Sequence, residues 1–305
     1  FIDLKKKKKI EKDLVFFRSL DSKKRKKILQ NYEEILKLNE TSKPYLFKAL
    51  DLDISLSSKA ELINKLKQLS DSYGYGENTK LVNWVENVFR LPFNKYRKEI
   101  ITKNNTKKEI TLFLNKCSQT LDECIYGHKS AKNKLLQVIA QNITNPKPEG
   151  IVLGIRGPMG NGKTTLVEKG ISKILNRPFA HVSLGGAVDS SFLDGHSFTY
   201  EGSLWGKIAD ILMKSQCMNP IIYFDELDKV SGTYKGKDII NILIHLVDPS
   251  QNKFFQDKYF SGLDLDLSQC IFVFSYNDSS QINPILRDRI TEIDTKGFKI
   301  TEKYQ

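Results

Sequence analysis

The sequence contains no apolar run that approaches the ~20 residues a helix needs to span a bilayer. Five lysines directly follow Phe1-Ile2-Asp3-Leu4, with no apolar stretch behind the charges, which excludes a secretory signal. Cysteines are few, and their wide spacing offers no metal-ligand pair, as is typical of ordinary thiols in a reducing compartment. They are Cys117, Cys124, Cys217 and Cys270. These absences predict a soluble intracellular protein, in the cytoplasm, with no membrane partner.

The sequence also lacks an initial methionine, which together with its abrupt end indicates a fragment of something longer. Its 305 residues are enough for about two domains. The net charge is uneven, because residues 1–110 carry +11 of the total of +12. Such a basic region can attract nucleic acid or acidic protein surfaces. Alternatively its lysines form the solvated faces of long helices, and the sequence leaves both interpretations open.

The pattern of apolar residues changes near residue 120. Before it, amphipathic periodicity predicts helices within 1–38, around 60–69 and around 81–89. After it, short apolar runs alternate with helical segments, which is typical of a parallel sheet covered by helices on both faces. The sequence therefore predicts an α/β fold with a parallel five-stranded sheet, preceded by an α-helical N-terminal region. The five expected strands are 151–156, 179–184, 220–225, 270–275 and 291–294.

A glycine-rich segment follows the first expected strand and completes the G-x-x-x-x-G-K-[ST] pattern of a phosphate-binding loop. Its backbone N–H groups and the start of the helix behind it would face a bound anion. Lys163 is expected to reach the β- and γ-phosphates, and the Thr164 hydroxyl to hold Mg²⁺. The segment therefore predicts that the chain binds ATP with Mg²⁺. Its residues are Gly157, Pro158, Met159, Gly160, Asn161, Gly162, Lys163, Thr164 and Thr165.

Polar residues at the ends of two later strands extend this chemistry. Asp225 is expected to bind Mg²⁺, usually through water, and Glu226 to polarise the attacking water. Asn277 follows the next strand along the chain and is placed to orient that water; the alternative is a turn-forming asparagine. We expect Lys163 and Asp225 at the tips of adjacent strands, since ligands of such sheets lie beyond the carboxyl ends.

Two arginines, Arg287 and Arg289, stand just before the last expected strand. An arginine here would stabilise the transferred phosphoryl charge in a neighbouring subunit. The alternative is a surface ion pair with Asp288.

Together these residues resemble the AAA+ ATPases and, within them, the Lon protease family. The resemblance runs from about Leu81 to Gly297, and its most specific part is Leu246-Val247-Asp248-Pro249-Ser250-Gln251-Asn252 with 254–259 after it. Members of this family are hexameric, ATP-driven unfoldases that thread protein substrates into a Ser/Lys proteolytic chamber. The resemblance therefore implies a homo-oligomeric ring that acts on unfolded proteins.

Carried over residue by residue, the resemblance implies further roles. Arg289 matches the trans-acting arginine better than Arg287 does, and Tyr200 matches the aromatic that grips substrate in the central pore. Glu201 and Trp205 depart from the family pattern beside it. The implied parts are a lysine-rich helical arm at 1–110, an ATPase core at 111–297 and the start of a truncated lid at 298–305. The residues implied to line the adenine pocket are Ile125, Tyr126 and Gly127.

Other functions remain open at this point. The first is a Lon-like ATPase that remodels proteins without a protease, and the second is a nucleic-acid-dependent ATPase that uses the basic N-terminal region. The third is an ATP-gated scaffold, against which Glu226, Asn277 and Arg289 argue. No Ser/Lys proteolytic pair stands in a suitable context here, because that domain would follow the lid.

Overall fold

A computed structural model gives the fold of the chain. The residues it describes are 15–40, 43–71, 75–145, 150–187, 189–230 and 234–297. The chain divides into two compact units, Phe1–Asp51 and Leu52–Gln305. The expected start of a lid, at 298–305, lies outside the described residues. Within those residues, every helix is too short or too polar to span a bilayer.

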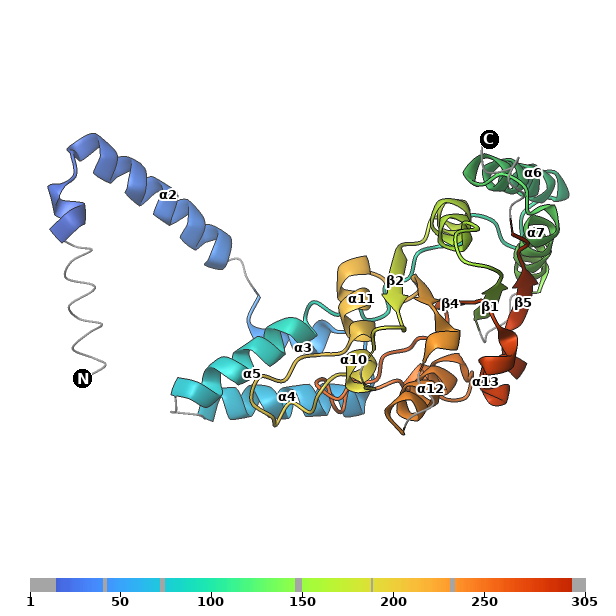
Figure 1. The fold of residues 1–305 in the computed structure, drawn as a ribbon. Helices are drawn as coiled ribbons and strands as arrows, with labels where there is room; N and C mark the ends of the chain where they lie inside the picture. Colours follow the sequence, from blue (N-terminus) through green and yellow to red (C-terminus); the bar gives the residue numbers. More distant parts are fainter. Residues whose placement is uncertain are drawn as a thin grey trace. The chain divides into compact units, whose positions relative to one another are not determined.

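Helices account for most of the regular structure in the described residues (Figure 1). The first unit contains α2 (Ser22–Glu40) and α3 (Tyr45–Asp51). The helices of the second unit are α4 (Leu56–Asp71), α5 (Tyr75–Val88), α6 (Lys107–Cys124), α7 (Lys129–Thr144), α8 (Lys163–Thr165), α9 (Ser172–Leu175), α10 (Ser191–Asp194), α11 (Lys207–Ser215), α12 (Tyr234–Val247) and α13 (Pro284–Asp288).

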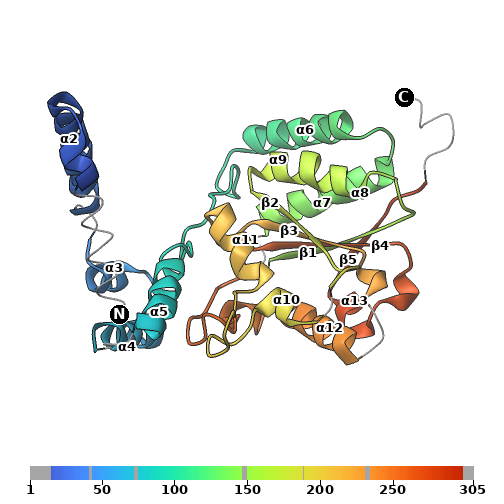
Figure 2. The ribbon, with the colours of Figure 1, turned by 60° about the vertical axis from the view of Figure 1, so that its left-hand side comes forward.

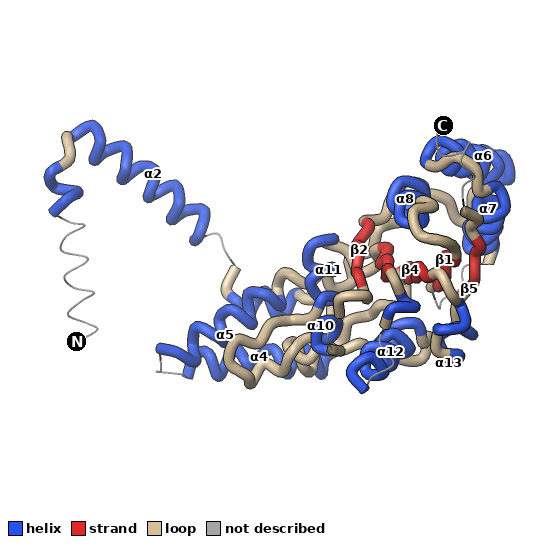
Figure 3. The backbone as a smooth tube through the Cα atoms, viewed as in Figure 1, coloured by secondary structure: helices blue, strands red, loops and turns tan. Residues whose placement is uncertain are grey.

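The second unit is built around a parallel sheet of five strands in the order β2-β3-β4-β1-β5. Figure 3 shows these strands in red between the helices. Strand β4 is buried along its whole length, as expected of a central strand covered on both faces. The predicted α/β class is confirmed, and the predicted strands agree with the observed ones to within one residue at each end. The strands are β1 (Ile151–Arg156), β2 (Phe179–Ser183), β3 (Ile221–Asp225), β4 (Ile271–Tyr276) and β5 (Thr291–Asp294).

Helices cover both faces of this sheet (Figure 2). On one face, α6, α7 and α9 pack against alternate strand residues such as Ile155, Tyr223 and Val273. On the other face lie α10, α11, α12 and α13. There Phe224 and Phe274 stack with ring centroids 5.2 Å apart. The alternation of side chains along each strand therefore separates two apolar layers.

Two local features fix the helices of the first face. Helix α6 begins with a capping box, in which Thr106 accepts the Glu109 N–H at 3.3 Å and the Glu109 carboxylate accepts the Thr106 N–H at 2.7 Å. Between α8 and α9 the helix is π-helical over Leu166–Ile171. Its Gly170 lies so close to α6 that a side chain would press on Leu121 and Cys124. The helix after the glycine-rich loop is thereby packed tightly onto α6.

The strand order corrects one prediction. β1 pairs with β4 and β5, whereas β3 pairs with β2 and β4. The strands that precede Lys163 and end in Asp225 are therefore not adjacent, because β4 lies between them. Asn277 directly follows β4, so this strand order places it between the loop after β1 and the acids after β3.

Helices α4 and α5 pack onto the sheet-containing part of the second unit. Trp84 of α5 is 1% exposed, and its indole N–H donates to the Tyr259 carbonyl at 2.8 Å. Its ring lies 6.2 Å from those of Phe198 and Phe260. The hydrogen bond attaches α5 to Tyr259, and the ring contact attaches it to Phe198, two residues before Tyr200.

Candidate nucleotide site

The loop between β1 and α8 has the backbone geometry of an anion cradle. Gly160 and Gly162 have φ angles of 70° and 81°, in the left-handed region that favours glycine. The Gly157 N–H donates to the Tyr276 carbonyl at 3.1 Å, which ties the start of the loop to the end of β4. A side chain at Gly160 would meet nothing within 4 Å, so the cradle is open on that side. Loops of this shape bind phosphate through their N–H groups.

Lys163 lies across the mouth of the loop. Its ammonium group donates to the carbonyls of Gly157 at 2.6 Å and Pro158 at 3.0 Å, and to Asn277 Oδ1 at 3.2 Å. Burial lowers the pKa of Lys163, and the nearby Asp225 and Asp228 oppose that shift. The cation is therefore held by neutral oxygens, which a phosphate group can replace with stronger, charge-assisted bonds.

Asp225 lies at the end of β3, beside the helix that begins with Lys163. Its Oδ1 atom accepts from the Glu226 N–H at 3.1 Å and from the Ser275 hydroxyl. The Tyr223 hydroxyl lies 3.5 Å from the same atom and 3.3 Å from the Thr164 hydroxyl. Tyr223 thus links the two oxygen ligands expected for Mg²⁺, and oxygen is the donor this cation prefers.

Glu226 has a backbone conformation that is unusual for its residue type. Its φ is 60°, in the left-handed region, and its N–H lies within 3.3 Å of the Ser275 hydroxyl. Its carboxylate rests against Gly185, where any side chain would overlap Glu226 Oε2. The turn after β2 therefore limits where this carboxylate can lie.

Asn277 is positioned by a residue to which the sequence assigned no role. Asp228 is buried, and its Oδ2 atom accepts the N–H groups of Asn277 at 3.0 Å and Asp278 at 3.3 Å. The only feature of the sequence that could have pointed to Asp228 is its place two residues after the Asp225-Glu226 pair. Its partners lie 49 and 50 residues further along the chain, so the sequence could not indicate them.

One cavity of about 400 Å³ brings these groups together. The glycine-rich loop and the ends of β3 and β4 line it, which places the predicted phosphate, metal and water-activating residues around one space. The open cradle at Gly160 and the oxygen pair of Thr164 and Asp225 fit a phosphate chain with Mg²⁺. The predicted site residues that line this cavity are Met159, Gly160, Asn161, Gly162, Lys163, Thr164, Thr165, Asp225, Glu226 and Asn277.

The segment implied to hold adenine borders the loop but does not line that cavity. Ile125 lies against Gly162, and its carbonyl accepts from Lys132 at 2.6 Å. The His128 ring lies 2.9 Å from the Asn161 carbonyl, which joins this segment to the loop a second time. Tyr126 is 51% exposed, and Gly127 has φ 70°. Arg289 also lies outside the lining of the cavity.

The loop that carries Tyr200 is fixed at its base by a buried acid that the sequence did not single out. Tyr200 itself is 68% exposed, so it is not part of the core. Asp257 is 0% exposed and accepts the N–H groups of Gly206 at 2.7 Å and Tyr259 at 2.9 Å. Burial raises the pKa of Asp257 to about 7, against the effect of these hydrogen bonds.

The tip of the same loop is held by α5. The Lys80 ammonium donates to the Tyr200 carbonyl at 2.7 Å and lies 5.0 Å from the centre of the Phe198 ring. Lys65 of α4 lies over the same ring at 5.1 Å. Cations over an aromatic face are attracted to it. Two lysines of the basic N-terminal region therefore contact this loop.

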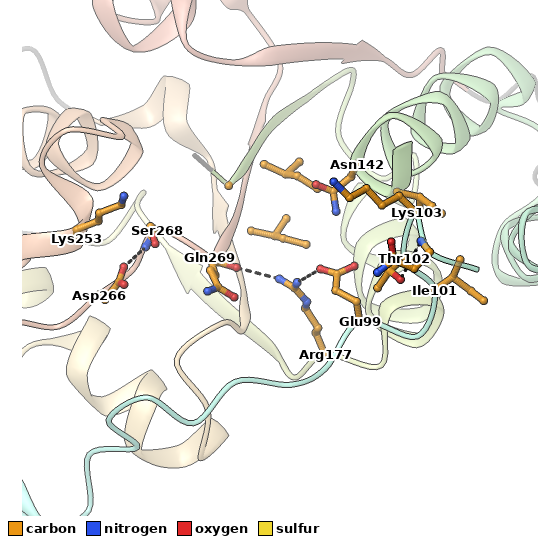
Figure 4. A pocket seen from close by; sticks show the side chains of 15 residues that line it. Glu99, Ile101, Thr102, Lys103, Asn142, Arg177, Lys253, Asp266, Ser268 and Gln269 are labelled. Carbon is orange, nitrogen blue, oxygen red and sulfur yellow. Dashed lines mark hydrogen bonds and ion pairs between the residues drawn. The ribbon is translucent and has the colours of Figure 1, made fainter. Parts of the chain in front are cut away.

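A larger cavity, of about 610 Å³, lies at the ends of the strands opposite to the phosphate loop, where β1 and β4 begin (Figure 4). It borders Ile151 and Ile271, the first residues of β1 and β4. Arg177, 9% exposed, crosses it and donates to Glu99 at 2.7 Å and to the Gln269 carbonyl at 2.9 Å. The ion pair of Arg177 and Glu99 joins the segment before α6 to the sheet, away from the phosphate loop.

Comparison with known proteins agrees with this geometry. Residues 153–297 match the family described as "ATPase family associated with various cellular activities (AAA)". The chain is 43% identical over 192 residues to a Lon protease homolog of Acanthamoeba polyphaga mimivirus, a match that covers 63% of this chain and 19% of the relative. It is 34% identical over 248 residues to the Lon protease of Fusobacterium nucleatum, covering 81% of this chain and 30% of that protein.

A further relative, the Lon protease of Clostridioides difficile, is 36% identical over 221 residues, which are 72% of this chain and 26% of that protein. The chain carries an AAA+ module of the Lon family. It spans less than a third of the length of the curated relatives it matches. The matched part includes the whole nucleotide cavity, so the module is an ATPase region homologous to those of Lon proteases.

Proposed function

We propose that this chain binds ATP with Mg²⁺ and hydrolyses it, and that the hydrolysis drives unfolding and translocation of protein substrates. The observation that carries the proposal is the single cavity lined by the glycine-rich loop, the two acids after β3 and the asparagine after β4. Each group has a separate role in phosphoryl transfer, and the folded chain brings them within one small volume.

The residues around the cavity have different roles in binding and in hydrolysis. Lys163, released from its carbonyl partners, binds the terminal phosphates, while Thr164 and Asp225 supply oxygen ligands for the metal. Bound Mg²⁺ neutralises the charge that develops on the phosphates. Glu226 accepts a proton from the attacking water, and Asn277 orients that water from the side of β4.

We propose further that the module works in a homo-oligomeric ring, with six subunits as in the family it resembles. Arg289 of one subunit would then reach the phosphates held by its neighbour. Tyr200, exposed on a loop fixed at both base and tip, would contact the substrate protein. Proteolysis by a domain elsewhere in the complete protein belongs to this proposal.

The division of the chain also stays a proposal. We place the lysine-rich helical region at 1–110 and the ATPase core at 111–297. The contacts of Lys65 and Lys80 give the basic region a role in holding the Tyr200 loop.

The test is Glu226→Gln in the complete protein. Glutamine preserves the shape of the side chain but cannot accept the proton, so ATP binding should persist while turnover falls by roughly 10²–10⁴-fold. ATP affinity is measured by titration with a fluorescent analogue and turnover by phosphate release. Glu123→Gln, on the exposed face of α6, is the control. Normal turnover in Glu226→Gln would remove the proposed role of this residue.

A further inference from the structure

Arg289 is held by an acid of its own subunit, and not by the neighbouring acid in the sequence. It follows the last residue of α13, and its guanidinium lies 2.9 Å from Asp248 Oδ2. The two side chains are 32% and 12% exposed. Within the described residues, no other ion pair of this guanidinium is found. Arg287, by contrast, is exposed, so the structure distinguishes the two arginines.

Asp248 is itself fixed by the turn that follows α12. Its Oδ1 atom accepts the N–H of Ser250 at 2.9 Å and the Ser250 hydroxyl at 2.6 Å. Gln251 approaches Oδ2 at 3.3 Å, and the Asn252 N–H closes the turn on the Asp248 carbonyl at 2.9 Å. The hydrogen bonds from Ser250, and then the charge of Arg289, lower the pKa of Asp248 to about 2. The carboxylate is therefore ionised and has one orientation.

We propose that Asp248 is a positioning residue that holds the Arg289 guanidinium ready for the phosphates of the neighbouring subunit. This inference rests on the proposed function, because it requires a ring in which Arg289 acts in trans. The segment Asp248-Pro249-Ser250-Gln251-Asn252 then has a defined role. One carboxylate oxygen of Asp248 binds Arg289, and hydrogen bonds from Ser250, within the segment, occupy the other oxygen.

The strengths of the interactions fit such a role. An arginine side chain has many rotamers, so an unheld guanidinium would visit many positions. A partly exposed ion pair is a weak interaction. That is enough to bias the orientation of Arg289 and too little to compete with the stronger hydrogen bonds that a phosphate accepts from an arginine.

Mixed rings of the complete protein test the inference. An Arg289→Ala subunit lacks the arginine but keeps its own catalytic residues, and a Glu226→Gln subunit is inactive but keeps the arginine. Mixing the two should restore ATP turnover at the sites where a Glu226→Gln subunit supplies its Arg289 to a neighbouring Arg289→Ala subunit. Adding Asp248→Asn to the Glu226→Gln subunit should reduce the restored turnover at least tenfold. Misplacement of a catalytic group by ~1 Å can cost about 10²-fold in rate.

Two controls separate positioning from a general loss of structure. Adding Asp248→Asn to the Arg289→Ala subunit should cause no further loss, because the residue it would position is already absent. Adding Asp288→Asn to the Glu226→Gln subunit should leave restoration intact, since Asp288 is exposed and is not the acid paired with Arg289.

A second measurement does not depend on turnover. In rings made only of hydrolysis-deficient Glu226→Gln subunits, a fluorescent ATP analogue should dissociate several-fold faster when either Arg289→Ala or Asp248→Asn is added, and Asp288→Asn should have no effect. If mixing fails to restore turnover, the trans role of Arg289 and this inference both fall. If the Asp248→Asn subunit restores turnover as well as its parent, the inference alone is wrong.

Discussion

Glu226 shows how a single backbone position determines chemistry in this module. A left-handed conformation costs a non-glycine residue about 1–2 kcal/mol, yet Glu226 adopts it at φ 60°. Side chains before and after it fix the conformation, since its N–H contacts both Asp225 and Ser275. The carboxylate is thereby directed to the turn at Gly185, and its placement depends on that residue having no side chain.

We therefore predict that Gly185→Ala slows ATP turnover at least tenfold while leaving ATP affinity nearly unchanged. The added methyl group would overlap Glu226 Oε2 and displace the carboxylate. Displacement of a catalytic group by ~1 Å can cost about 10²-fold in rate. Gly186→Ala is the matched control, because a side chain there would meet nothing within 4 Å. Equal turnover in the two variants would contradict the prediction.

Asp257 leads to a prediction about pH. Because its folded-state pKa is about 7, well above the usual value of 3.8, the folded protein keeps a proton that the unfolded chain releases between about pH 4 and 7. The contribution of Asp257 to stability is therefore greatest at low pH and declines as the pH rises through this window.

Asparagine at position 257 does not titrate, although it loses one backbone hydrogen bond at every pH, at a cost of about 1 kcal/mol. The stability of the wild type relative to Asp257→Asn should therefore fall as the pH is raised from about 5 to about 8. Urea unfolding at several pH values measures this difference. A difference that stays constant across the range would show that Asp257 is charged in both states.

At the level of elements, the loop that carries Tyr200 is held by interactions from three separate parts of the chain. Asp257 closes its base, while Lys65 and Lys80 reach it from α4 and α5. The connection gives the helices before the core an influence on the part of the module proposed to contact substrate.

Lys80→Met should loosen this loop. The change removes the hydrogen bond to the Tyr200 carbonyl and the contact with Phe198, together about 1–2 kcal/mol at a partly exposed site. Chymotrypsin cleavage in the loop should therefore accelerate about tenfold, and unfolding of a protein substrate should slow. Lys116→Met, on an exposed part of α6, is the control. Unchanged cleavage would indicate that Lys80 does not hold the loop.

The sequence predicted the elements better than their arrangement. Short apolar runs bounded by polar residues located all five strands, and the reason is plainest in β3 and β4, because a strand buried on both faces requires such a run. The order of the strands depends on how the helices cross over the sheet, and the insertion of β4 between β1 and β3 was not foreseen. Asp228 and Asp257 were missed for a related reason: both act on backbone N–H groups far away in the sequence.

For the whole molecule, the sequence predicts the cavity within one chain better than it predicts the site proposed between two chains. The groups from Lys163 to Asn277 meet in one cavity, as the motifs indicated. Arg289 was recognised through a resemblance, but its partner Asp248 became visible only when α12 and α13 were seen side by side. A ring is what would join these two parts into one catalytic unit.

The ATP affinity of Lys163→Met decides whether the loop after β1 binds nucleotide, and it is determined by titration of the complete protein with ATP in the presence of Mg²⁺. Loss of this cation should weaken binding by roughly 100-fold, since charge-assisted bonds to phosphate contribute about 3 kcal/mol. Lys169→Met, an exposed lysine on the same helix, should bind as the wild type does. Equal affinity in the wild type and Lys163→Met would contradict a nucleotide site at this loop.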